Sequence, residues 1–334
     1  MNYFFNILII IFIIGCSNNI ITYSNVDQQQ ENNDSEINSQ IDNIINLVNT
    51  DKLDQALEIL KELIEKSPDN YRIYEVIGAI YIKKANYDDA LSFLNKAYQL
   101  KPDNYKILDK LGVVYIEKKQ YDKALEILKK SSELEPNSSY SWLHLGITYL
   151  KLNQVDKSID SFERAQKINP NDVNAWFNCG IVYMELLNDW EKAISSFIKV
   201  TNIQLNNIKA WLNLGYCYRS NKEIEKSIWA YQKALDIDSN NPKIFNNLGL
   251  SYILKGDFSN SIEMFNKAIS LDNNYAESYY NLAVIYSLKG DKNNSIFYLK
   301  RSLELSYDLR EKAINDSNFN NINKSEEFKS LIKI

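Results

Sequence analysis

Asparagine recurs at nearly constant spacing in the second half of the chain, with intervals of 35, 34 and 34 residues between Asn178, Asn213, Asn247 and Asn281. A carboxamide donates and accepts hydrogen bonds at the same time, so it can pair with both backbone groups of a peptide residue. A regular row of amides therefore suits an extended peptide that is held through its main chain. We predict that these four side chains contribute to a peptide-binding site.

The residue types that most often carry catalysis or bind metals are few: one histidine, His144, and three cysteines, Cys16, Cys179 and Cys217. A structural zinc site typically takes four such ligands at close spacing, and these four residues are not grouped. No serine, cysteine or paired carboxylate stands at a known catalytic spacing from His144, and the chain has no Gly-rich phosphate loop. We expect no catalytic residue, no metal and no cofactor, and hence no enzyme activity of its own.

Charge and cysteine content exclude two further classes. The net charge of −5 is spread over both signs along the chain, whereas a nucleic-acid-binding surface needs a basic patch. Three cysteines are too few for a disulfide framework. Cys179 and Cys217 are expected to be buried free thiols that behave as small apolar side chains, with a disulfide between them as the alternative.

The asparagines belong to a longer repeat, in which glycine recurs every 34 residues at Gly78, Gly112, Gly146 and Gly180. Aligning the small residues divides 37–309 into eight repeats, which start at residues 37, 71, 105, 139, 173, 208, 242 and 276. We number the positions within each repeat as slots, so that glycine stands in slot 8 and the asparagines in slot 6. Repeat 5 is one residue longer, and its extra residue falls in the turn 187–190.

Each repeat is predicted to form two helices. Large apolar residues in slots 4, 7 and 11 have the i, i+3, i+7 spacing of one helix face. Small residues in slots 8 and 20 allow the two helices to approach closely, and proline in slot 32 of the early repeats ends the second helix. The later repeats lack this proline, and we expect Asn-rich turns to stop their second helices. Repeat 4 shows the set most completely, with Trp142, Leu145, Gly146, Tyr149, Ser158, Phe162, Ala165 and Pro170.

This pattern resembles the tetratricopeptide repeat, a helix–turn–helix unit that stacks into a superhelix. The resemblance implies an all-α fold, a right-handed α-solenoid of about eight such repeats over residues 37–309. Repeat 1 is degenerate, as a terminal capping unit should be. Residues 310–334 are expected to form one or two capping helices, with a frayed tail as the alternative.

The N-terminus has the features of a targeting segment. Its apolar run, 7–14, is too short to cross a bilayer, which takes about 20 residues, and it fits the core of a secretory signal peptide. The sequence Ile13-Ile14-Gly15-Cys16 resembles a bacterial lipobox, which implies that residues 1–15 are removed and that Cys16 carries a lipid. The n-region has no Lys or Arg, so an uncleaved signal anchor and an ordinary soluble N-terminus remain alternatives.

Residues 17–36 contain four acidic and no basic residues. They hold too little apolar surface to offset the entropy of ordering, so we expect residues 16–36 to be a disordered tether that begins with the lipid-anchored cysteine. In the alternative interpretation, part of this segment extends the first helix.

The resemblance also predicts a binding surface. The first helices of tetratricopeptide repeats line a concave groove, so slots 2, 5, 6, 9, 12 and 13 are expected to face a ligand. Two alternatives stay open: asparagine is common in slot 6 of the family, and the apolar residues could pack between repeats. Besides the four asparagines, the predicted groove contains His144 in slot 6, apolar residues in slots 5 and 9, and two lysines in slot 2: Leu143, Phe177, Leu212, Tyr216, Lys209 and Lys243.

Together these features predict a lipid-anchored scaffold on the extracytoplasmic side of a bacterial cell envelope. It would bind an extended protein segment and serve the assembly or tethering of an envelope complex, with a protein or peptide partner and a membrane contact through its lipid. Neither a nucleic acid nor a small-molecule substrate is expected. The alternatives are a surface-exposed lipoprotein that binds an external or host ligand, and the regulatory subunit of an enzyme complex.

Overall fold

The computed structural model describes residues 32–332, and this part of the chain contains eighteen α-helices and one short 3-10 helix but no β-strand. The predicted all-α fold is therefore confirmed. The predicted signal peptide, Cys16 and most of the predicted tether lie outside the described residues. The first helix begins at Asn32, so residues 32–36 of the predicted tether are helical.

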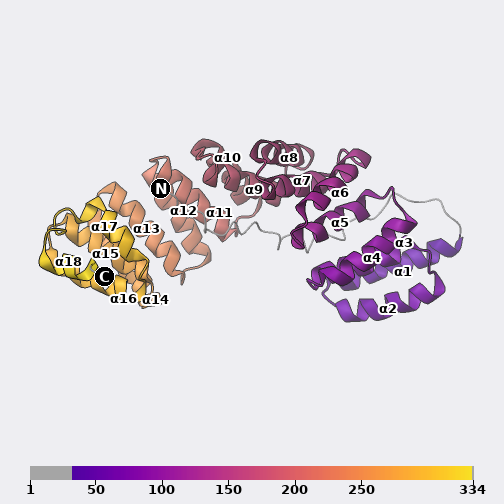
Figure 1. The fold of residues 1–334 in the computed structure, drawn as a ribbon, viewed down its shortest axis with the longest axis horizontal. Coiled ribbons are helices and arrows are strands. Elements are labelled where there is room, and N and C mark those ends of the chain that lie inside the picture. Colours follow the sequence, from indigo (N-terminus) through magenta and orange to yellow (C-terminus); the bar gives the residue numbers. More distant parts are fainter. Residues whose placement is uncertain (1–31, 333–334) are drawn as a thin grey trace. The chain divides into compact units, whose positions relative to one another are not determined.

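Sixteen helices form eight consecutive pairs, one pair for each repeat (Figure 1). The first helices, which we call A helices, are α1 (Asn32–Asn49), α3 (Tyr71–Lys83), α5 (Tyr105–Glu117), α7 (Ser139–Lys151), α9 (Val173–Glu185), α11 (Ile208–Ser220), α13 (Pro242–Lys255) and α15 (Ala276–Leu288). The second, or B, helices are α2 (Leu53–Lys66), α4 (Tyr87–Leu100), α6 (Tyr121–Leu134), α8 (Val155–Ile168), α10 (Trp190–Ile203), α12 (Ile224–Ile237), α14 (Phe258–Leu271) and α16 (Lys292–Leu305).

The chain divides into two compact units, and the boundary between Val182 and Tyr183 falls within α9. In the N-terminal unit, the A and B helices pack on a core that includes Ile77, Leu94 and Leu111. In the C-terminal unit, cores form around Phe265 and, at the end of the array, around Tyr280. Each core lies between the helices of successive repeats, as expected for a repeat array in which each unit buries its apolar face against its neighbour.

Close contact between the A and B helices depends on the glycine in slot 8. A Cβ atom at Gly146 would lie 2.5 Å from the ring of Phe162 on α8, and one at Gly112 would lie 2.4 Å from the side chain of Leu128 on α6. These distances are too short for any non-bonded contact, so a larger residue at either position would force the facing side chain or its helix to shift. The predicted role of the small residue in slot 8 is confirmed.

Serine in slot 20 does more than save space. In repeats 4, 6, 7 and 8 its hydroxyl donates to the backbone carbonyl of slot 8 on the paired A helix, at 2.7–2.8 Å: Ser158 to Gly146, Ser227 to Gly215, Ser261 to Gly249 and Ser295 to Ala283. A buried hydroxyl without a partner would be costly, and this bond removes that cost. The sequence predicted the small size of this residue but not its hydrogen bond.

Short polar residues cap the N-termini of most A helices. Asn104 accepts a hydrogen bond from the backbone N–H of Lys106, and Asn241 accepts one from that of Lys243. Such N-caps satisfy backbone donors that the helix leaves unpaired, and asparagine is among the preferred residues there. Asn241 follows a helix that ends at Ile237 without the slot-32 proline, and its side chain caps the start of the next helix.

The C-terminal segment packs onto repeat 8. It forms α17 (Leu309–Asn315), a 3-10 helix (Ser317–Phe319) and α18 (Glu326–Ile332). Its buried residues Ala313, Phe319 and Phe328 join Tyr280 and Leu299 of repeat 8 in one apolar cluster. The cluster covers surface that a further repeat would otherwise bury.

Candidate functional site

In the C-terminal unit, three predicted groove residues share one face of α11. Lys209, Asn213 and Tyr216 are spaced i, i+4, i+7, so they lie on one side of the helix. Lys209 is exposed, Asn213 is half-buried, and the Tyr216 side chain is 42% exposed. Leu212, beside Asn213, is half-buried. The surface therefore offers a cation, an amide and an aromatic ring in order along the helix.

The next A helix, α13, contacts α11 and repeats part of this arrangement. Lys243 is exposed and Asn247 is half-buried, in the same slots as Lys209 and Asn213. We call Lys209, Asn213, Tyr216, Lys243 and Asn247 the amide face of the C-terminal unit. Two lysines, two amides and one tyrosine thus lie on the same side of two contacting helices.

The predicted groove residues of the N-terminal unit are buried. Leu143 is 3% exposed, Phe177 8%, His144 1% and Asn178 2%. The open alternative, in which apolar residues of slot 5 pack between repeats, describes Leu143 and Phe177 better than a ligand floor does.

His144 is a buried, neutral side chain. Its Nδ1 lies 2.8 Å from the carbonyl oxygen of Tyr140, one helical turn earlier, and its ring centroid lies 4.1 Å from that of Tyr140. Burial lowers the pKa of His144 to about 4, because the charged form would lose its hydration. These contacts describe a histidine packed within α7, and the sequence alone gave no indication of its burial.

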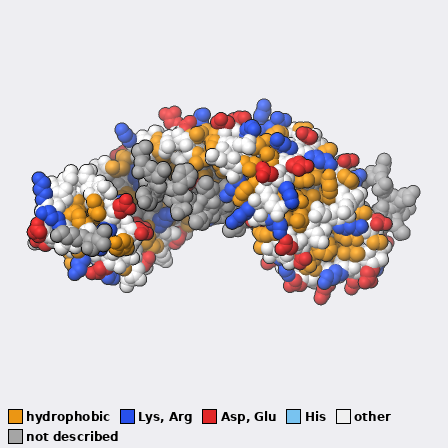
Figure 2. Space-filling model, viewed as in Figure 1, with side chains coloured by type: hydrophobic (Ala, Val, Ile, Leu, Met, Phe, Trp, Pro, Cys, Tyr) orange, Lys and Arg blue, Asp and Glu red, His pale blue; other side chains and the backbone are white. Residues whose placement is uncertain are grey.

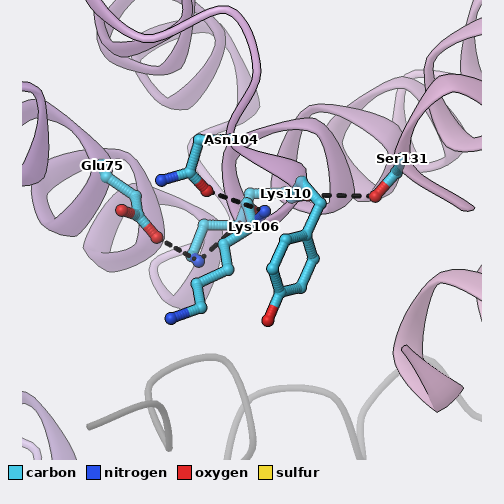
Figure 3. A network of polar contacts seen from close by, with 6 residues as sticks. Glu75, Asn104, Lys106, Lys110 and Ser131 are labelled. Carbon is cyan, nitrogen blue, oxygen red and sulfur yellow. Dashed lines mark hydrogen bonds and ion pairs between the residues drawn. The ribbon is translucent and has the colours of Figure 1, made fainter. Parts of the chain in front are cut away.

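Side chains in slot 6 form polar contacts with side chains in slot 5 of the preceding repeat. Nζ of Lys110 in slot 6 lies 2.8 Å from Oε1 of Glu75 in slot 5 of the preceding repeat, and both side chains are largely buried (Figure 3). The same contact recurs in the C-terminal unit, where Nδ2 of Asn281 donates to Oδ1 of Asn246 at 2.8 Å. Both pairs are 35 residues apart. Slot 6 therefore meets slot 5 of the preceding repeat.

This rule separates Asn281 from the other asparagines. Asn281 is 7% exposed and its amide is bonded to Asn246, so it joins two repeats. For Asn178, slot 5 of the preceding repeat holds Leu143, whose side chain has no hydrogen-bond acceptor. Nδ2 of Asn178 is buried without a hydrogen-bond partner among the described residues. Before Asn247, slot 5 holds Leu212, and the side-chain amide of Asn247 likewise has no partner within residues 32–332. The pairing could have been found by comparing slots 5 and 6 along the sequence.

A second buried polar cluster surrounds Asp109, in slot 5 of repeat 3. Its carboxylate is 3% exposed and accepts from Oγ of Ser131 at 2.6 Å and from Oγ of Ser141 at 2.7 Å. Asp109 on α5 is thus bonded to Ser131 on α6 and to Ser141 on α7. Oγ of Ser131 also donates to the carbonyl oxygen of Tyr105 at 3.1 Å, a bond that Figure 3 shows. Asn246 of repeat 7 accepts from Ser278 in the same way, at 3.1 Å. The role of slot 5 as a junction between repeats was not predicted.

Burial raises the pKa of Asp109 to about 6, although both serines and Lys110 favour its charged form. Because its folded pKa exceeds the ordinary value, the folded state takes up a proton at higher pH than the unfolded state. The buried, charged carboxylate of Asp109 therefore lowers the free energy of unfolding above pH 6. This loss of stability is relieved as the pH falls from about 6 towards 4 and the carboxylate takes up its proton. We expect Asp109→Asn, which keeps the acceptor oxygen, to remove a pH-dependent gain of up to about 3 kcal/mol in stability.

Urea unfolding of the full chain at pH 8, 6 and 4 measures this effect. The control is Asp122→Asn, an exposed carboxylate at the start of α6. Equal pH dependence of wild type and Asp109→Asn would contradict the interpretation.

Surface charge, potential metal ligands, helix hydrophobicity and the cysteines bear on the class of ligand that this protein could bind. Acidic and basic side chains are interspersed on the face in view in Figure 2. Residues 32–332 contain no group of three or more His, Cys, Asp or Glu side chains placed to hold a metal ion. No helix within the same range is long and apolar enough to span a membrane. Cys179 and Cys217 are buried, as predicted, and form no disulfide with each other, and burial raises the pKa of Cys217 to about 12.

Comparison with known protein families agrees with the repeat. Models of the TPR repeat match residues 148–186, 215–256 and 249–290, and a tetratricopeptide repeat model matches residues 276–309. The chain therefore carries tetratricopeptide repeats. The model of the ChAPs (Chs5p-Arf1p-binding proteins) matches residues 1–162. No curated protein matches this chain.

Solved structures show the same fold. The C-terminal part of a TPR repeat-containing protein from Cytophaga hutchinsonii is 18% identical, with a TM-score of 0.59 over 73% of this chain and 98% of its own. YrrB, described as a TPR protein with an unusual peptide-binding site, is 17% identical, with a TM-score of 0.52 over 56% of this chain and 96% of its own. At such identities the likeness extends to the fold alone.

Proposed function

We propose that this protein, which carries tetratricopeptide repeats, is a scaffold that binds an extended segment of a partner protein through the amide face of its C-terminal unit. We further propose that a lipid on Cys16 holds it on the extracytoplasmic side of a bacterial cell envelope, where it serves the assembly or tethering of a complex. The tetratricopeptide fold itself supports interaction with proteins or peptides.

One observation carries the first proposal: the amides of Asn213 and Asn247 have no hydrogen-bond partner among the described residues, while Asn281 is bonded within the protein. Half-buried amides that lack protein partners can pair with the N–H and C=O groups of a bound backbone. The lysines in slot 2 and the exposed ring of Tyr216 add charge and apolar area on the same side. An extended peptide offers all three complementary groups, namely backbone, acidic and apolar side chains.

The match to the ChAPs model supports an adaptor role in a general way. That family is named for binding two other proteins, Chs5p and Arf1p. The name supports the binding of proteins as the class of activity.

Replacing Asn213 and Asn247 together with alanine is expected to weaken partner binding at least tenfold while changing stability by less than about 1 kcal/mol, because neither amide is bonded within the described protein. The measurement is a crosslinking pull-down from native membranes, with thermal unfolding of each variant in parallel.

The matched control for this pair is Asn281→Ala. It removes a buried hydrogen bond to Asn246 and should lower stability by about 1 kcal/mol with binding retained. Loss of stability in the double variant with binding intact would rule out the amide face as the binding surface.

The lipid anchor has its own test. A processed protein should begin at a Cys16 that carries acyl chains, because the thiol is the group that receives the lipid. Mass spectrometry of the N-terminal peptide, with and without globomycin, measures this, and Cys16→Ala should release the chain from membranes. An unmodified and uncleaved Cys16 would end the proposal of a lipoprotein but leave that of the amide face in place.

A further inference from the structure

The extra residue of repeat 5 changes the turn between its two helices. In repeat 6 the backbone N–H of Glu223 donates to the carbonyl of Tyr218, five residues earlier. In repeat 5 the N–H of Asp189 donates to the carbonyl of Tyr183, six residues earlier, with Asn188 in the left-handed region at φ 51°. The turn thus closes in the same way around one additional residue.

Two leucines of the longer turn are exposed. Leu186 is 39% exposed and Leu187 is 46% exposed. Trp190 begins α10 and is half-buried, and its ring packs edge-on against Tyr216 of the amide face, with centroids 6.0 Å apart. We call Leu187, Trp190 and Tyr216 the anchor patch, which lies wholly within the C-terminal unit.

Slot 14 at this edge holds lysine in repeats 2, 3, 7 and 8. Lys84 of repeat 2 pairs with Asp54 of the preceding repeat at 2.6 Å, and Lys255 of repeat 7 lies 3.9 Å from Glu225. In repeats 4 and 5, slot 14 holds a leucine, which is half-buried at Leu152 and exposed at Leu186. Exposed leucines next to an aromatic pair form an apolar surface of the kind that marks interaction sites.

The charges around the anchor patch restrict its ligand. The guanidinium of Arg219 lies 5.4 Å from the centre of the Tyr216 ring, and Lys209 is exposed on the same helix face as Tyr216. The nearest acid of the turn, Asp189, lies 3.7 Å from Lys192 and caps α10. Arg219 thus borders the ring of Tyr216, while Asp189 is engaged within its own helix.

We infer that the anchor patch binds one large apolar side chain of the partner segment, next to an acidic residue that faces Arg219. Tryptophan, tyrosine and arginine dominate binding energy at interfaces, where the contacts around them exclude water. The inference rests on the proposed function, since Tyr216 also belongs to the amide face, and it adds the chemistry of the segment that is bound. The specificity would come from the extra residue in repeat 5.

The test is a selection of random twelve-residue peptides, displayed on phage, against the purified full chain. We expect the selected peptides to share a large apolar residue adjacent to Asp or Glu. Their affinity should fall roughly 10- to 30-fold for Tyr216→Ala and for deletion of Leu187, a variant that restores the turn length of the other repeats. Phe297→Ala, which removes a 64% exposed ring from α16, is the control and should change affinity less than twofold.

The outcomes separate the two proposals. Peptides that lose affinity for the Asn213→Ala, Asn247→Ala double variant but bind Tyr216→Ala and the Leu187 deletion as tightly as wild type would overturn the anchor patch and leave the amide face. Selected peptides without a shared apolar residue would also overturn it. Failure to select any peptide, or binding that is unchanged in all three variants, would count against both proposals. Circular dichroism melts confirm that each variant is folded.

Discussion

Replacing Phe319 with alanine is expected to lower the stability of the C-terminal unit by about 3–5 kcal/mol, the usual cost of deleting a buried aromatic ring. Phe319 has no exposed surface, and its ring lies 5.6 Å from the centroids of both Tyr280 and Phe328. Its loss leaves a cavity between repeat 8 and the C-terminal helices. Because these helices cover the end of the array, the effect should be concentrated in α15 and α16.

Hydrogen exchange followed by mass spectrometry locates this effect. Amides of α15 and α16 should exchange about 100- to 1000-fold faster in Phe319→Ala, the factor that corresponds to 3–4 kcal/mol. Amides of α3–α6 should keep their wild-type rates, because stability in repeat arrays is carried mainly by neighbouring units.

Phe297→Ala is the matched control, since it deletes an exposed ring from the same region and should change stability by no more than about 0.5 kcal/mol. Equal effects of the two substitutions, or unchanged exchange in α15, would show that the C-terminal segment does not stabilise the array.

Gly146→Ala is expected to destabilise the N-terminal unit by about 3 kcal/mol, at the upper end of the cost of overpacking. The added methyl would lie 2.5 Å from the ring of Phe162, which is fully buried and cannot move aside. The paired helices α7 and α8 must therefore separate. Urea unfolding, with hydrogen exchange of α7 and α8, measures the loss.

Repeat 8 provides a rescue for this substitution. There Ala283 occupies slot 8 and the fully buried Leu299 occupies slot 24, so the fold accepts alanine opposite leucine. The double variant Gly146→Ala, Phe162→Leu copies that pair and should recover part of the stability. A double variant that is less stable than the sum of its two single substitutions would contradict steric conflict as the cause.

Much of the fold could be predicted because the repeat fixes the environment of each slot. The period of 34 residues placed the helices, the i, i+3, i+7 spacing identified their buried faces, and Gly146 indicated close helix contact. The extra residue in the turn of repeat 5 was also visible as a break in the period. These features are local, so a single sequence contains them in full.

The candidate site could be predicted only in part. Slot spacing placed Asn213, Asn247 and Asn281 in equivalent positions, and the structure separates them because of the residue they meet on the preceding repeat. Asn281 meets the amide of Asn246, whereas slot 5 before Asn247 holds a leucine. Whether such an amide is bonded within the described protein thus depends on the residue it meets on the preceding repeat, which for Asn281 is Asn246.

The sequence by itself thus determined the helix pairs, the repeat boundaries and the side of each helix that is apolar. Only the tertiary structure decided that Leu143 and His144 are buried, that Asp109 joins three helices, and that Tyr216 stays exposed beside Trp190. The physical reason is that periodicity reports the orientation of a side chain about its own helix. Its burial and its hydrogen-bond partners depend on the size and polarity of side chains contributed by the neighbouring repeat.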